Sequence, residues 1–182
     1  MNVKSWDIVA YGGRSAPGRG GRRTGEREER SGERPGERPG QPTAFVAELG
    51  GFQEVPPILT GARGRFRAEL TPDGALEYEL WYENLSGPAT QAHIHFGQPG
   101  VNGEVVVFLC GGGDAPACPG AGGRVAGRIE PEDIVAVPQQ GVEAGDLAGV
   151  IRAMRAGATY VNVHTPQFPA GEIRGQIRPQ RR

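Results

Sequence analysis

Roughly the last three quarters of the chain consist of short runs in which apolar and polar residues alternate, each ended by glycine or proline. Such a period of two places successive side chains on opposite faces of a β-strand. In the run 75–83, Leu76, Tyr78 and Leu80 therefore share one face, and the turn Pro72-Asp73-Gly74 joins this run to the preceding one as a hairpin. The other strand candidates are 44–49, 64–70, 90–96, 104–109, 123–129, 158–164 and 171–178. Many short strands with frequent turns predict an all-β fold, an antiparallel sandwich or barrel.

One segment departs from this pattern. Between Gly145 and Gly157, four apolar residues recur at helical spacing, with Asp146 as the expected N-cap and Gly157 as the expected C-terminal stop. These residues are Leu147, Val150, Ile151 and Met154. We expect one short helix on the end of the sandwich.

The first 42 residues have a different composition from the rest. They are rich in Arg, Gly, Glu and Pro, and the motif Gly-Glu-Arg-Pro repeats over 32–40 with a period of four. Such a segment buries too little apolar surface to offset its ordering entropy, so we expect a disordered tail or linker over 1–42 and one folded domain over 43–182. The alternative is a tethering arm for an anionic partner.

Charge and hydropathy narrow the classes of partner. The tail has a net charge of +3 and the domain of −4, and a dense basic face with interleaved aromatics, typical of nucleic-acid binders, is missing from the sequence. No apolar run approaches the ~20 residues of a membrane span, and the N-terminus lacks the apolar stretch of a signal peptide. We expect neither nucleic-acid binding nor a membrane span, and leave the oligomeric state open.

All three histidines fall in two strand-like motifs, Ala92-His93-Ile94-His95-Phe96 and 160–166, which ends with His164. On a strand His93 and His95 point the same way, roughly 6.5–7 Å apart, and the apolar residues between them face the opposite side. Three imidazoles from two strands can meet on one copper or zinc ion. The alternative is a polar cluster without metal, in which the rings only staple two strands of an adhesion domain.

Neighbouring polar residues offer supporting roles for such a site. Gln91, Asn162 and Glu172 could orient the rings or supply a fourth ligand. Glu172 and Arg174 alternate along their strand and could instead form an ion pair on the surface.

A metal site with an open position could also be catalytic, activating water or cycling copper. A Ser-His-Asp arrangement is not supported, because Ser86 is the only serine beyond the tail and lies in an expected turn. We therefore name no catalytic residue, and keep a small redox or hydrolytic metalloenzyme as the alternative function.

Cys110 and Cys118 bracket a glycine-rich loop. Their spacing suits a disulfide in an oxidising compartment, worth roughly 2–3 kcal/mol in the chain-entropy model. The alternatives are free thiols, or thiolates recruited to a metal, which the flexible glycines disfavour.

Several motifs appear together in an order that resembles the CHRD domain, the repeat first described in chordin and also found in stand-alone bacterial proteins. The motifs are 45–49, Glu54-Val55-Pro56-Pro57, Ala92-His93-Ile94-His95, 103–109, 160–165 and 169–176. The resemblance implies an immunoglobulin-like β-sandwich in a secreted, periplasmic or cell-surface protein. It also implies a non-enzymatic binding or structural module with a protein or cell-envelope partner.

Overall fold

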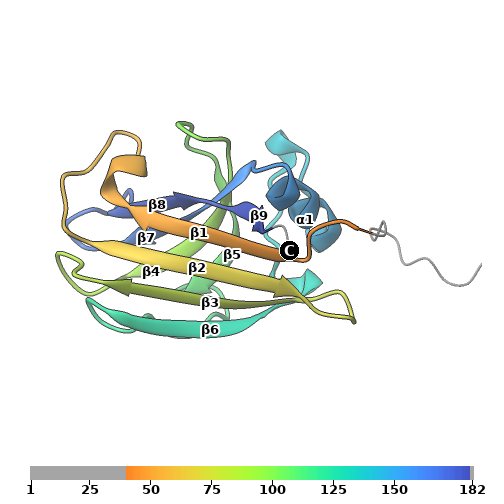
Figure 1. Ribbon diagram of the computed structural model, residues 1–182, viewed down its shortest axis with the longest axis horizontal. Coiled ribbons are helices and arrows are strands. Elements are labelled where there is room, and N and C mark those ends of the chain that lie inside the picture. The colour runs from red at the N-terminus through yellow and green to blue at the C-terminus, as the bar shows by residue number, and fades with distance from the viewer. Residues whose placement is uncertain (1–39, 181–182) are drawn as a thin grey trace, which may run out of the picture. The chain divides into compact units, whose positions relative to one another are not determined.

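The computed structural model describes residues 40–180, which form an antiparallel β-sandwich with one α-helix at its end (Figure 1). This confirms the predicted immunoglobulin-like β-sandwich with one short helix. The prediction of a disordered tail concerns mainly residues 1–39, which lie outside the described residues. The strands are β1 Ala44–Gly50, β2 Arg63–Leu70, β3 Leu76–Glu83, β4 Gln91–Phe96, β5 Glu104–Cys110, β6 Gly123–Ile129, β7 Thr159–His164, β8 Ile173–Gln176 and β9 Arg178–Gln180. The helices are α1 Leu147–Arg155 and the 3₁₀ turns η1 Gly51–Gln53, η2 Pro131–Asp133 and η3 Pro138–Gln140.

The strands follow one hydrogen-bonded path, β5-β4-β7-β8-β1-β2-β3-β6, and β9 adds to β1. The path folds over on itself into two layers, one of β5, β4, β7 and β8 and the other of β1, β2, β3 and β6 (Figure 1). A single residue pair, Gly50 with Arg174, joins β1 to β8 where the path turns from one layer to the other. The result is a nearly closed sandwich.

The core lies between the two layers. Leu76, Tyr78 and Leu80 of β3 are buried, as their shared face predicts, and the intervening residues point to solvent. The hydroxyl of Tyr78 crosses the core and donates a 2.6 Å hydrogen bond to the carbonyl of Leu109 on β5. Fully burying one aliphatic side chain such as Leu76 or Leu80 contributes about 1.5–3 kcal/mol, so this face adds several kcal/mol to the stability of the fold.

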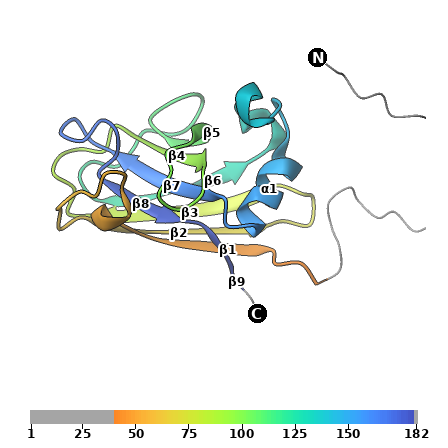
Figure 2. The same cartoon turned by 90° about the horizontal axis from the view of Figure 1, so that it is seen from above.

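Helix α1 closes one end of the sandwich (Figures 1 and 2). Its four predicted apolar residues are buried, and the Asp146 carboxylate accepts a 2.8 Å hydrogen bond from the Gly149 amide as the N-cap. Gly157 follows with φ of 69°, the left-handed conformation that ends helices. In the described part of the chain, no helix has the length and apolar character that crossing a bilayer requires.

The run predicted as one strand over 171–178 is divided in the structure. β8 pairs with β7 up to Gln176, and the chain then bends at Ile177 and continues as β9 on β1. Gly175 lies at this crossing, where a Cβ would come within 2.5 Å of the Glu48 carbonyl oxygen. The bend carries the chain from one layer to the other, which hydrophobic alternation alone does not encode.

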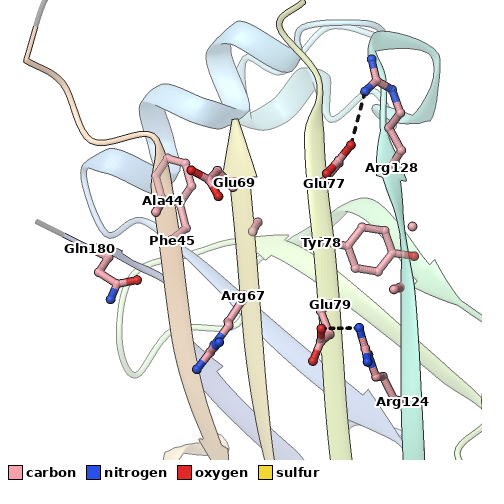
Figure 3. Close-up of a pocket in the computed structure, with 13 residues that line it drawn as sticks. Ala44, Phe45, Arg67, Glu69, Glu77, Tyr78, Glu79, Arg124, Arg128 and Gln180 are labelled. Atoms are coloured by element: carbon pink, nitrogen blue, oxygen red, sulfur yellow. Dashed lines mark ion pairs between the residues drawn. The ribbon is translucent and has the colours of Figure 1, made fainter. Parts of the chain in front are cut away.

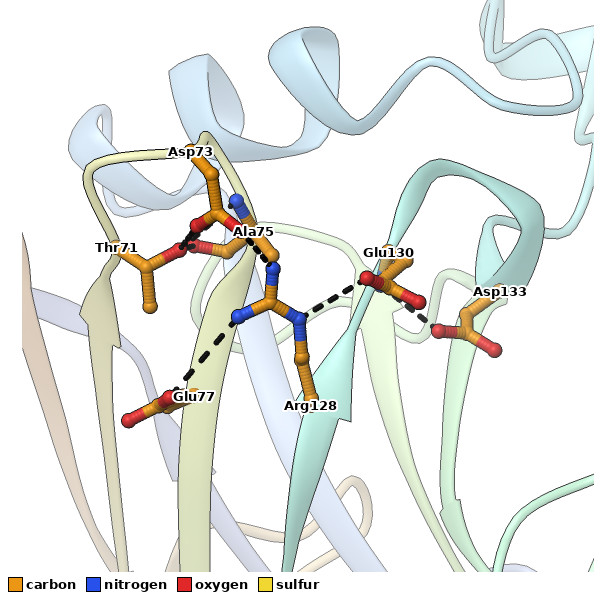
Figure 4. A network of polar contacts seen from close by, with 7 residues as sticks. All are labelled: Thr71, Asp73, Ala75, Glu77, Arg128, Glu130 and Asp133. Carbon is orange, nitrogen blue, oxygen red and sulfur yellow. Dashed lines mark hydrogen bonds and ion pairs between the residues drawn. The ribbon is translucent and has the colours of Figure 1, made fainter.

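The outer face of the β1-β2-β3-β6 layer carries paired charges around an open depression of about 710 Å³ (Figure 3). Arg124 pairs with Glu79 at 2.6 Å. At the end of the same layer, Arg128 contacts Asp73, Glu77 and Glu130 (Figure 4). The side chains of these pairs are exposed to solvent, so each pair contributes at most about 1 kcal/mol. All of the predicted metal ligands lie on the other layer.

Candidate functional site

The three histidines come together on the outer face of the β5-β4-β7-β8 layer. β4 and β7 are antiparallel neighbours, and Gln91 lies opposite His164 while His95 lies opposite Tyr160. Directly opposed residues share a face, so His93, His95 and His164 all point away from the core. One ring nitrogen from each lies within 4.8 Å of the others. The structure thus brings together the three residues that the sequence proposes as ligands.

Although these histidines face away from the core, they are buried. Their exposed fractions are 5% for His93 and 9% for His95 and His164. The loops 97–103 and 165–171 contribute carbonyls that contact the rings. The cluster therefore lies under a layer of loops, in surroundings that penalise unpaired polar atoms.

Backbone carbonyls fix the orientation of two rings. Nδ1 of His95 lies 2.9 Å from the Gly103 carbonyl oxygen, and Nδ1 of His164 lies 3.0 Å from that of Pro169. A carbonyl only accepts, so each Nδ1 carries the proton and each Nε2 is left with a free lone pair. This is the arrangement in which metal-binding histidines are commonly held.

The position of the proton on His93 follows from its position on His164. Nδ1 of His93 lies 3.1 Å from Nε2 of His164. Because that Nε2 has no proton, Nδ1 of His93 must donate, which leaves Nε2 of His93 as an acceptor. In the described part of the chain, Nε2 of His93 and Nε2 of His95 are buried without any hydrogen-bond partner. Two orphaned lone pairs in one cluster are what a bound cation would satisfy.

The spacing also suits an ion. Ligand nitrogens bound tetrahedrally at 2.0–2.1 Å from zinc lie about 3.3 Å from one another. One ring nitrogen from each histidine lies within 4.8 Å of the others, so the rings must rotate to bring three lone pairs onto one ion.

Aromatic side chains hold the rings in place. The ring of Phe108 packs edge-on against His93, with 4.7 Å between centroids and an angle of 88°. The ring of Tyr160 is stacked on His95 at 4.7 Å and 2°. Ring positions fixed in this way reduce the entropy lost when a ligand is bound.

Burial keeps the imidazoles neutral. It lowers the pKa of His93 to about 3, with further lowering by the charges of His164 and His95. Burial also lowers the pKa of His95 to about 4, against the opposing effect of its hydrogen bond to Gly103. The pKa of His164 is lowered by burial as well. At neutral pH all three residues are in the uncharged form that binds metals.

The polar neighbours proposed to assist the site have other partners in this structure. Gln91 donates to the Gly111 carbonyl at 3.3 Å, and Asn162 donates to Glu54 at 2.6 Å. The carbonyls of loop residues, which leave no trace in the sequence, orient the rings instead. A role for Gln91, Asn162 or Glu172 with bound metal stays a prediction.

The prediction of a surface ion pair between Glu172 and Arg174 is wrong, because loops cover this face and both side chains are at most 1% exposed. The Glu172 carboxylate accepts hydrogen bonds from the hydroxyls of Thr60, Ser86 and Thr165, at 2.9, 2.7 and 2.8 Å respectively. Burial alone would raise the pKa of Glu172, but these bonds outweigh it and hold the pKa below its ordinary value. Glu172 therefore ties together segments around the site.

Sequence reasoning also missed two members of this face. Arg174 places its guanidinium 3.4 Å over the ring of Tyr160, which is also stacked on His95. Tyr160 could have been found, because it alternates with Asn162 and His164 along the same strand. The burial of Arg174 has no such signal.

The predicted disulfide is present. Cys110 and Cys118 are joined with an S–S distance of 2.01 Å, and no free cysteine occurs among the described residues. The alternatives of free thiols and of thiolate ligands do not apply to this structure.

Comparison with known proteins gives one match. The model of the family described as CHRD domain matches residues 45–177, which include all three histidines, both cysteines and every strand from β2 to β8. No curated protein and no solved structure matches the chain.

Proposed function

This chain belongs to the CHRD domain family, and on that premise we propose that it is a non-enzymatic, extracytoplasmic module that binds one copper or zinc ion through His93, His95 and His164. The observation that carries the proposal is the pair of buried, unpartnered nitrogens, Nε2 of His93 and Nε2 of His95, within a cluster of three neutral imidazoles.

A cluster that only stapled two strands would satisfy its own hydrogen bonds. Leaving one buried acceptor unpaired costs about 1–3 kcal/mol, and this cluster leaves two. A cation between the rings removes that cost. His95 and His164 are already oriented for binding by their Nδ1 protons, and His93 would turn its Nε2 toward the ion, or move its proton from Nδ1 to Nε2 and bind through Nδ1.

Three imidazole nitrogens favour zinc or copper over the oxygen-binding cations calcium and magnesium. When bound, such an ion would supply a Lewis-acidic or redox-active centre. The chain's own contribution is to hold three rings rigidly beneath a cover of loops.

The burial of the cluster supports a binding module more than an enzyme, since 5–9% exposure leaves little surface for a substrate to reach the rings. The disulfide supports an extracytoplasmic location, because such bonds persist in oxidising compartments. The partner we propose is a protein or cell-envelope component, and copper-loaded protein that turned over an oxidisable substrate would favour the metalloenzyme instead.

The test is elemental analysis of protein purified without chelators and without a histidine tag. We expect about one equivalent of copper or zinc, none in the variant with all three histidines replaced by alanine, and an unchanged content in the control Tyr82→Phe, which removes a hydroxyl that bonds to Pro119 on the opposite layer. Absence of metal even after incubation with both ions would refute the proposal.

Thermal unfolding separates this proposal from the strand-staple alternative. Zinc at 100 times its Kd should stabilise the wild type by about 2.7 kcal/mol and leave His93→Gln unaffected. If the histidines only staple strands, His93→Gln lowers the stability of the chelated protein and zinc changes neither protein.

A further inference from the structure

Arg174 is an unusual residue for the middle of a β-layer. It lies on β8 with 1% of its surface exposed, and its guanidinium donates to three acceptors. These are the carbonyls of Gln98 and Val101, at 3.1 and 2.8 Å, and Oδ1 of Asn102, at 3.1 Å. All three acceptors belong to the loop 97–103, so the guanidinium binds the backbone of that loop to β8.

The end of the same loop orients His95. The Gly103 carbonyl is the acceptor for Nδ1 of His95 at 2.9 Å, and the Gly103 amide donates to the hydroxyl of Tyr160 at 3.2 Å. A Cβ at Gly103 would lie 1.8 Å from the carbonyl oxygen of Phe96, so no other residue fits this close approach. The position of the loop therefore decides where the acceptor for His95 lies.

Arg174 also acts on His95 through the stacked ring of Tyr160. The guanidinium carbon of Arg174 lies 3.4 Å from the ring centroid of Tyr160, and that ring lies parallel to His95 at 4.7 Å. Cation–π contact holds the tyrosine ring, and the tyrosine ring fixes the plane of the imidazole. Arg174 thus acts on His95 through both the loop and the stack without touching it.

We propose that Arg174 is a positioning residue that locks the plane and the Nδ1–H tautomer of His95, and so keeps Nε2 of His95 free to bind a metal. The effect of Arg174 on metal binding rests on the proposed function. The effect of Arg174 on the plane and tautomer of His95 does not rest on it, and can be measured in metal-free protein.

The experiment is long-range ¹H–¹⁵N correlation NMR on chelated, ¹⁵N-labelled protein, which shows which ring nitrogen carries the proton. In the wild type we expect His95 as the Nδ1–H tautomer. In Arg174→Met we expect exchange-averaged nitrogen shifts or the opposite tautomer for His95, with the His164 ring unchanged. The matched control is Tyr82→Phe, which removes a 3.0 Å hydrogen bond to Pro119 from the opposite layer and should leave the His95 signals as they are.

Zinc titration of the same proteins completes the test. Loss of the groups that orient a ligand typically weakens metal binding by about 10- to 100-fold, which we expect for Arg174→Met and not for Tyr82→Phe. If Arg174→Met does not fold, Asn102→Ala removes one acceptor of the guanidinium at an exposed position, and we expect it to broaden the same His95 signals.

A wild-type His95 with its proton on Nε2 would overturn the proposal, as would His95 signals identical to wild type in the folded variant. If the His95 tautomer changes as expected but neither the wild type nor any variant binds zinc or copper, the positioning role of Arg174 stands and the proposed metal function fails.

Discussion

Replacing Glu54 with glutamine should make the protein more stable at pH 8, and by a smaller margin at pH 5. Glu54 follows η1 with 6% of its surface exposed. Burial raises its pKa from 4.5 to about 7, against the lowering effects of a 2.6 Å hydrogen bond from Asn162 and of the charge on Arg174. Above pH 7 the folded protein must hold this carboxylate in surroundings that disfavour its charge.

The direction in which stability changes with pH follows from proton binding by Glu54. Between pH 4.5 and about 7 the folded protein holds the Glu54 proton more tightly than the unfolded chain does, so stability falls as the pH rises through this window. One pKa unit corresponds to about 1.4 kcal/mol, which bounds the loss at roughly 3.5 kcal/mol for the interval from 4.5 to about 7. We expect a gain of about 1–2 kcal/mol for Glu54→Gln at pH 8, because side-chain relaxation and water screen such charges. The amide oxygen of glutamine can still accept from Asn162.

The assay is urea unfolding of both proteins at pH 5 and pH 8 in the presence of a chelator. Comparing the variant with the wild type at each pH cancels the contribution of the histidines. Glu132→Gln, at an exposed position, is the matched control and should change stability by less than about 0.5 kcal/mol at either pH. A Glu54→Gln protein that is less stable at pH 8, or whose difference from wild type is the same at both pH values, would refute the reasoning.

Three further predictions concern stability. Replacing Cys110 and Cys118 with serine should lower the free energy of unfolding by about 2.5 kcal/mol, the chain-entropy value for a sequence separation of 8, and an unchanged urea midpoint would contradict this. Met154→Ala should cost about 2–5 kcal/mol, because this side chain is fully buried on the inner face of α1, yet leave the zinc stoichiometry unchanged in titration; a variant that lost zinc would show that the helix supports the site. Removing the exposed pair between Arg124 and Glu79 by Arg124→Ala should cost less than about 1 kcal/mol in thermal unfolding, and a larger loss would mean that the pair is not simply solvated.

The alternation of residues along the chain was sufficient to predict which side chains of β3 face the core and which strand residues face outward. A second pattern, four apolar residues at helical spacing, predicted helix α1, because this spacing places them on one face only in a helix. The bend at Ile177 was missed, since a strand that moves from one layer to the other keeps the same pattern on both sides of the bend.

At the site, spacing alone placed His93 and His95 on one face. The approach of His164 depended on the pairing of β4 with β7, which are more than sixty residues apart in the sequence, so the sequence could propose the meeting of the three rings but not the strand pairing that produces it. The burial of Arg174 and of Glu172 was not predictable from their strand, because the loops that cover them fold over from elsewhere in the chain.

The three histidines belong to two neighbouring strands of one layer, so the loss of an ion would not separate any parts of the fold. β4 and β7 are already joined along their whole length by backbone hydrogen bonds, so an ion between them adds no connection that the fold lacks. The core between the layers does not depend on it. Unlike a zinc finger, which unfolds without its metal, this domain would keep its shape when emptied. The proposed ion could therefore enter and leave without unfolding of the domain.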